Sequence, residues 1–178
     1  MSISRGRTVI ILGDNFNAQV YHELRDCLTG ADKPVIVAAV RSDIELIDSN
    51  GNELIRPDLG IEDIPDFNFD ALILSDGSVS DDLRTSEEFH NLIRYAHDTG
   101  IIIGTIDQSV RYLIDAGVAA THFLTGSPDI RYELEINGAQ YQNEPVWVDG
   151  NLISGRLLED LSVFCKELIN QISLGPAA

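Results

Sequence analysis

The chain has 178 residues, which suits one domain, and its 29 Asp and Glu against 12 Lys and Arg give a net charge of −17. Phosphate backbones and anionic lipids repel such a charge, so nucleic acid and membrane surfaces are poor candidate partners. The content of 44% hydrophobic and 23% charged residues excludes a disordered chain or a coiled coil, and we expect residues 1–178 to form a single domain.

The first part of the chain alternates apolar runs with an amphipathic pattern. Residues 8–12 and 34–40 are uninterrupted apolar runs, which are typical of strands covered on both faces of a parallel sheet. Between them, residues 17–28 place Val and Leu on one stripe, which predicts a helix that stops at Gly30. An Asn-Gly pair within residues 44–55 predicts a β-hairpin.

The second part continues the alternation. Residues 71–74 and 101–106 predict two more buried strands, with a helix over residues 86–99 between them. A second hairpin is expected over residues 146–154, and a last helix over residues 162–172. Strands alternating with helices predict an α/β fold: a flavodoxin-like, doubly wound, mostly parallel sheet with helices on both faces, a three-layer sandwich.

The sequence also bears on location and redox state. No segment approaches the roughly 18–20 continuous apolar residues of a membrane span, and the N-terminus leads into a strand without the pattern of a signal peptide. Cys27 and Cys165 fall in predicted helices, where both are interpreted as small buried hydrophobic residues. Together these features favour a cytoplasmic protein without a disulfide framework.

Three aspartates, Asp14, Asp76 and Asp107, follow the predicted central strands. The carboxyl ends of parallel strands meet at one edge of a sheet, where such sheets bind ligands. Three neighbouring carboxylates repel one another, so they need a cation, an arginine, hydrogen bonds or a raised pKa. One candidate is therefore a Mg²⁺ or Ca²⁺ site formed by the three aspartates. In the alternative interpretation each aspartate only caps the helix that follows it.

Residues 104–113 lead from an apolar strand through a sharp turn into an amphipathic helix. This is the shape of a nucleophile elbow, which presents one side chain above the sheet at a helix N-terminus. The presented residue is Asp107, and the positive end of the helix would stabilise its ionised form. A carboxylate stabilised in this way is a weak nucleophile.

Several motifs resemble the ThiJ/PfpI superfamily, which has the fold of the class I glutamine amidotransferases. Residues 69–77, FDALILSDG, are similar to the family's (Y/F)DAL(I/L)LPGG, and residues 146–156, VWVDGNLISGR, to its VVDGNLITSR. Residues 104–108, GTIDQ, stand where the family has its AICHG elbow. The resemblance extends over nearly the whole chain, and it implies a homodimer or a higher homo-oligomer.

The resemblance also implies losses at the site. Asp107 stands in place of the family's nucleophilic cysteine, and Gln108 in place of the histidine after it. The helical glutamate that supports the cysteine has no counterpart, since the nearest residue is Gln19. Asp76 replaces the first glycine of the oxyanion turn, next to Gly77, and its negative charge opposes the purpose of such a turn. We therefore expect the family's thiol chemistry to be absent.

Two further residues are candidates for the site. His122 resembles a histidine that flanks the nucleophile in one branch of the family, and paired with Asp107 it could act as a general base on water. Its alternative role is a local hydrogen bond. Arg156 resembles the arginine of the TSR motif and could balance the carboxylates or an anionic ligand, or form only a surface salt bridge.

The sequence leaves three functions open. The favoured one is a catalytically degenerate family member that serves as a small-molecule-binding or oligomeric scaffold and needs no cofactor. The second is a hydrolase, hydratase or deglycase-like enzyme that uses Asp107, with His122, as nucleophile or general base. The third is the cation site. The expected binding pocket comprises Asp14, Gln19, Asp76, Gly77, Gln108 and Arg156.

Overall fold

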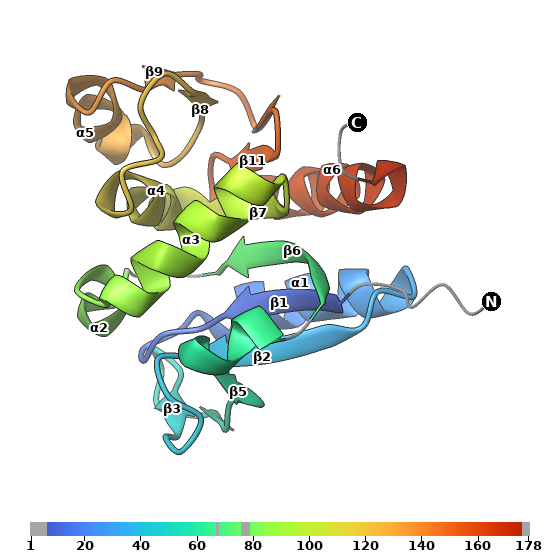
Figure 1. Cartoon of the computed structure of the whole chain (residues 1–178). Coiled ribbons are helices and arrows are strands. Elements are labelled where there is room, and N and C mark those ends of the chain that lie inside the picture. The colour runs from blue at the N-terminus through green and yellow to red at the C-terminus, as the bar shows by residue number, and fades with distance from the viewer. Residues whose placement is uncertain (1–6, 67, 76–78, 176–178) are drawn as a thin grey trace.

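A seven-stranded sheet, in the order β10-β11-β7-β6-β1-β2-β5, organises the chain in a computed structural model that describes residues 7–66, 68–75 and 79–175 (Figure 1). Only the β10–β11 pair is antiparallel, and every other neighbouring pair is parallel. The expected mostly parallel α/β sheet is confirmed. Its strands are β1 (Arg7–Ile11), β2 (Val35–Ala39), β5 (Leu59–Gly60), β6 (Phe69–Leu74), β7 (Ile102–Ile106), β10 (Val146–Asp149) and β11 (Leu152–Gly155).

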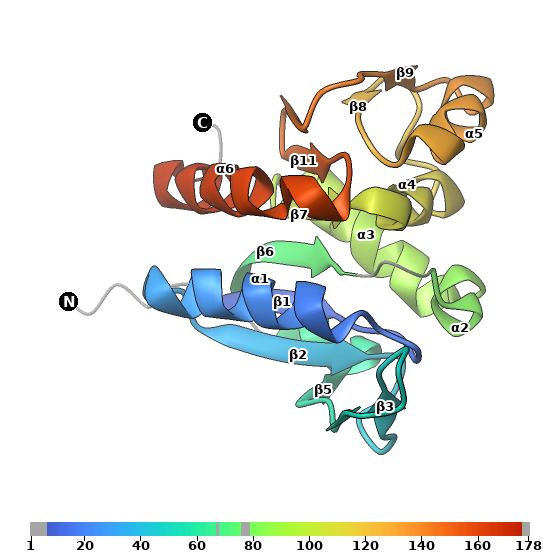
Figure 2. The ribbon, with the colours of Figure 1, turned by 180° about the vertical axis from the view of Figure 1, so that it is seen from behind.

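Helices cover both faces of this sheet, as expected for three layers. Figure 2 shows α1 and α6 together on one face, and Figure 1 shows α2, α3 and α4 on the other. The helices are α1 (Ala18–Gly30), α2 (Asp81–Arg84), α3 (Glu87–Thr99), α4 (Arg111–Asp115), α5 (Arg131–Ile136) and α6 (Leu161–Leu174). No helix in the described part of the chain is both long and apolar enough to cross a bilayer.

The two hydrophobic clusters explain the uninterrupted apolar runs. In β1, Val9 and Ile11 pack toward α3, whereas Ile10 and the following Leu12 pack toward α1 and α6. All four side chains are buried, because successive residues of a strand point to opposite faces and both faces are covered. The same rule accounts for the apolar runs that became β6 and β7.

Capping residues set the predicted helix ends. Asn17 accepts a hydrogen bond from the backbone N–H of Val20 at 3.1 Å and begins α1. Ser86 does the same for Phe89 at 3.2 Å and begins α3. Gly100, at φ +78°, ends α3 in the left-handed conformation that glycine adopts without strain. Both helices therefore lie where the sequence predicts them.

Most of the short elements have too little periodicity to be predicted, but the turn signal of the first hairpin was sufficient. The hairpin expected within residues 44–55 is β3 (Leu46–Ile47) with β4 (Leu54–Ile55). An unpredicted parallel pair, β8 (Phe123–Leu124) with β9 (Gln140–Tyr141), flanks α5. The 3₁₀ turns are η1 (Ile61–Asp66), η2 (Asp107–Val110), η3 (Pro128–Ile130) and η4 (Leu158–Asp160).

Candidate functional site

The strand order brings the expected residues to one edge of the sheet. β7, β6 and β1 are neighbours, so the segments that follow them, including Asp14 and Asp107, share the carboxyl edge. The direction of chain winding reverses between β6 and β1, and α/β sheets bind ligands at such a point. Asp76 and Gly77 lie outside the described residues, so the convergence of three aspartates remains a prediction.

Asp107 is the first residue of η2, at the sharp turn that follows β7. Its φ of +57° is in the left-handed region, which costs an ordinary L-residue about 1–2 kcal/mol but is most accessible to Asn and Asp. Beneath it, the buried Ser109 hydroxyl accepts a hydrogen bond from the Ile106 N–H and donates one to the Ile106 carbonyl, both at 2.9 Å. These two hydrogen bonds to the Ile106 backbone stabilise the turn, which has the expected elbow form.

The loop after β8 packs against this elbow. The Ser127 N–H donates to the Asp107 carbonyl at 3.3 Å, and the Ser127 side chain lies beside the Asp107 carboxyl group. Burial raises the pKa of that carboxyl group, the Ser127 side chain opposes the rise, and the charge of Asp129 adds to it. Asp107 is half-buried and therefore holds a proton more readily than an exposed aspartate.

Three hydrogen bonds hold this loop in place. The Thr125 N–H donates to the Ser154 hydroxyl of β11, and the Thr125 hydroxyl donates to the Glu144 carbonyl, both at 2.9 Å. The Tyr141 hydroxyl donates to the Gly126 carbonyl at 3.1 Å. An added Cβ at Gly126 would lie 3.1 Å from the Asp107 carbonyl oxygen, so the close approach requires a glycine.

Ser127 is thus the side chain beside Asp107 that the sequence analysis missed. The signal for it was the run Thr-Gly-Ser-Pro between two predicted elements, in which glycine permits close backbone approach and proline starts a helical turn.

His122 lies elsewhere. Its Nδ1 is 3.0 Å from Asp149 Oδ2, and its Nε2 is 3.0 Å from His97 Nε2. His97 is in the last turns of α3, just before β7, and Asp149 ends β10 in a hairpin at the amino end of β11. Asp107 follows the opposite end of β7, which at about 3.3 Å per residue is roughly 16 Å away. His122 therefore does not pair with Asp107, and it has instead the hydrogen-bonding role that the sequence left as its alternative.

Arg156 lies near the elbow, because Gly155 pairs with Ile106 at the ends of β11 and β7. Its guanidinium group, however, pairs with Asp160 at 3.1 Å and reaches the Asn143 side chain at 3.3 Å. The structure thus has the salt bridge that the sequence left as the alternative role of Arg156.

The remaining predicted pocket residues have separate surroundings. Asp14 is exposed and accepts a hydrogen bond from the Ile47 N–H at 3.0 Å, which anchors the β3–β4 hairpin. Gln19 is exposed on α1 and donates to Glu23 at 3.0 Å. Gln108, half-buried in η2, is the neighbour of Asp107 in the turn. Of this set, Gln108 alone is part of the elbow itself.

A cavity of about 210 Å³ lies at the carboxyl ends of β1 and β2, lined partly by Gly13, Asp14, Ser80 and Asp82. Within the described ranges, no three side chains form a cluster able to hold a metal ion. The predicted cation site therefore depends on Asp76.

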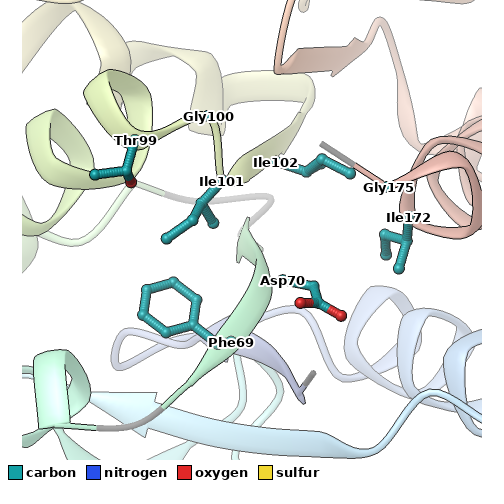
Figure 3. Close-up of a pocket in the computed structure, with 8 residues that line it drawn as sticks. All are labelled: Phe69, Asp70, Thr99, Gly100, Ile101, Ile102, Ile172 and Gly175. Carbon is teal, nitrogen blue, oxygen red and sulfur yellow. The ribbon is translucent and has the colours of Figure 1, made fainter. Parts of the chain in front are cut away.

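A second cavity, of about 190 Å³, lies at the opposite end of the sheet. Figure 3 shows Phe69, Asp70, Ile102 and Ile172 around it, where β6 and β7 begin and α6 ends. Parallel sheets bind ligands at the carboxyl ends of their strands, so this mainly apolar hollow is not the candidate site.

Known proteins with the same arrangement identify the fold. DJ-1beta of Drosophila melanogaster superposes with a TM-score of 0.86 at 24% identity, covering 94% of this chain and 90% of that one. A two-domain protein from Anabaena variabilis, with DJ-1/ThiJ/PfpI-like and ferritin-like domains, gives 0.89 at 22% identity. The match covers 94% of this chain but 48% of that protein, so the likeness concerns about half of its length.

Sequence relatives extend the comparison. An uncharacterized protein of Archaeoglobus fulgidus is 32% identical over 115 residues, 65% of this chain and 68% of the relative. An uncharacterized protein of Staphylococcus aureus is 26% identical over 168 residues, 93% of this chain and 98% of the relative. The profile of the DJ-1/PfpI family matches residues 6–171. Since that match spans nearly the whole chain, this protein belongs to the DJ-1/PfpI family.

Proposed function

We propose that this chain is a catalytically degenerate DJ-1/PfpI protein that binds a small polar molecule at the carboxyl edge of the sheet and associates with itself. The observation that carries the proposal is the elbow, which keeps its left-handed turn but presents the carboxyl group of Asp107. By the family resemblance, that position belongs to the nucleophilic cysteine. A carboxyl oxygen is a far weaker nucleophile than a thiolate at neutral pH.

The surroundings of the elbow support binding over thiol catalysis. Cys27 and Cys165 lie in α1 and α6, not in the turn, so neither thiol substitutes for the missing one. The half-buried Asp107 carboxyl group and the Ser127 side chain together offer hydrogen-bond donors and acceptors to a polar ligand.

A second candidate function is a hydrolase or hydratase in which Asp107 is a general base. Burial of the Asp107 carboxyl group favours this, because it raises the pKa and so the basicity of the carboxylate. In this version His122 takes no part, since its ring nitrogens are engaged by Asp149 and His97.

Turnover assays separate the two functions. The purified chain is assayed for glyoxalase, deglycase, esterase and peptidase activity beside Asp107→Asn, which keeps a residue suited to positive φ. Asp98→Asn, an exposed carboxylate at the end of α3, is the matched control. We expect no turnover from any of the three. Turnover that is lost in Asp107→Asn but retained in Asp98→Asn would show that the chain is an enzyme and not a scaffold.

Binding is tested in parallel. A library of small polar metabolites is screened by thermal shift against the wild-type chain, and each ligand found is tested again on Asp107→Asn and Asp98→Asn. The proposal expects stabilisation that weakens only in Asp107→Asn. Equal stabilisation of all three proteins would show that the ligand does not bind at the elbow.

A further inference from the structure

The two cysteines of the chain, far apart in sequence, meet where its first and last helices pack. Cys27 is in the final turns of α1 and Cys165 in the first half of α6, and both helices lie on the same face of the sheet (Figure 2). Both side chains line one surface groove of about 540 Å³, together with Glu23, Asp26 and Lys166. Both are free thiols.

The thiols are inequivalent partners. A hydrogen bond between the two side chains lowers the pKa of Cys27, although burial works against this. The same bond, with burial and the negative charge of Glu23, raises the pKa of Cys165. Exposure follows the same order, because Cys27 is half-buried and Cys165 is 7% exposed.

We propose that Cys27 and Cys165 form a redox-active dithiol that a peroxide oxidises to an intrachain disulfide between α1 and α6. The site is distinct from the elbow, and neither its chemistry nor its test depends on the function proposed for Asp107. The groove that exposes Cys27 admits an oxidant as small as hydrogen peroxide, since its volume is many times the roughly 30 Å³ that one water occupies.

The oxidation balances in two steps. The Cys27 thiolate attacks one peroxide oxygen, the O–O bond breaks, and Cys27 becomes a sulfenic acid while hydroxide leaves. The Cys165 sulfur then attacks the Cys27 sulfur and displaces its hydroxyl group, which takes up the Cys165 proton and leaves as water. The two thiols lose two electrons, and the peroxide is reduced to water. A thiol reductant reverses the change.

The test uses the full reduced chain and hydrogen peroxide. The expected result is the loss of both titratable thiols and of two hydrogen atoms from the intact mass of the monomer, restored by dithiothreitol. A linked Cys27–Cys165 peptide is expected on non-reducing digestion. Because the bridge ties the first helix to the last, the oxidised chain should also melt at a higher temperature than the reduced one.

Two matched variants assign the roles. In Cys165→Ser, Cys27 should stop at the sulfenic acid and label with dimedone, whereas in Cys27→Ser the remaining Cys165 should stay reduced over the same time. Thiols that remain titratable in the wild-type chain, a disulfide between two chains, or equal labelling of the two variants would each overturn the proposal. The wild-type measurement stands even if a variant fails to fold.

Discussion

Replacement of Gly126 by alanine tests whether the loop after β8 forms the wall of the elbow. An added Cβ would lie 2.7 Å from Val110 Cγ1, 3.1 Å from the Asp107 carbonyl oxygen and 3.2 Å from Ile130 Cγ2. The two side chains are fully buried and the oxygen belongs to the backbone, so none of the three yields easily. The loop must therefore move away from the turn and weaken the contact between Ser127 and Asp107.

The expected cost follows from these distances. Overpacking a buried site costs about 1–3 kcal/mol. For a chain of this length, each kcal/mol lowers the melting temperature by about 2–4 °C, so a midpoint loss of ~2 kcal/mol lowers it by roughly 6 °C. The matched control is Gly30→Ala at the end of α1, where nothing lies within 4 Å of the added Cβ. That control should lose no stability.

Two assays report the outcome. Thermal and urea unfolding give the change in free energy of unfolding, and a carbon-13 NMR titration follows the Asp107 carboxyl group. Burial is the largest cause of the raised pKa of Asp107, and the loop contributes to that burial. In Gly126→Ala the pKa should therefore fall toward the ordinary value, although the weaker contact with Ser127 works in the opposite direction. A Gly126→Ala variant as stable as the Gly30→Ala control, with an unchanged Asp107 titration, would show that the loop after β8 does not form the wall of the elbow.

Three more variants test individual side chains. Burial raises the folded-state pKa of Asp107 above its ordinary 3.8, so its ionisation costs stability as pH rises through the folded value. Asp107→Asn should therefore be at least as stable as wild type at pH 7 by thermal melting, an advantage that disappears as the pH falls through the raised folded-state pKa to 3.8. His122→Ala removes the bond to Asp149 and should lower the free energy of unfolding by about 1–2 kcal/mol in urea. Ligand binding at the elbow should be unchanged. Loss of that binding would show that His122 belongs to the site. Asn151→Ala removes a side-chain amide that donates to the Ile101 carbonyl at 2.8 Å and to two carbonyls at the end of α3, and should cost a similar amount by the same assay. Wild-type stability of this variant would show that these amide–carbonyl bonds do not stabilise the fold.

Local sequence patterns were sufficient to predict the fold class. The apolar runs at residues 8–12 and 101–106 are continuous because both faces of their strands are buried. The parallel sheet could therefore be predicted from the sequence. Asn17, Ser86 and Gly100 marked helix ends because capping depends on residues within one turn. The elbow at Asp107 was predicted for the same reason, since a strand, a turn and a helix follow one another directly.

The partners of the site residues follow from how distant segments of the chain pack together. Ser127 reaches Asp107 because a loop folds back over the turn, whereas His122, which the motif suggested, lies near the other end of β7 beside Asp149.

Burial, periodicity and turns were predictable because they depend on residues that are neighbours in the sequence. Only tertiary packing brought Cys27 and Cys165 to one groove, although they lie far apart in the sequence. A contact between segments that are distant in the sequence depends on how whole layers pack, so no local sequence pattern predicts it.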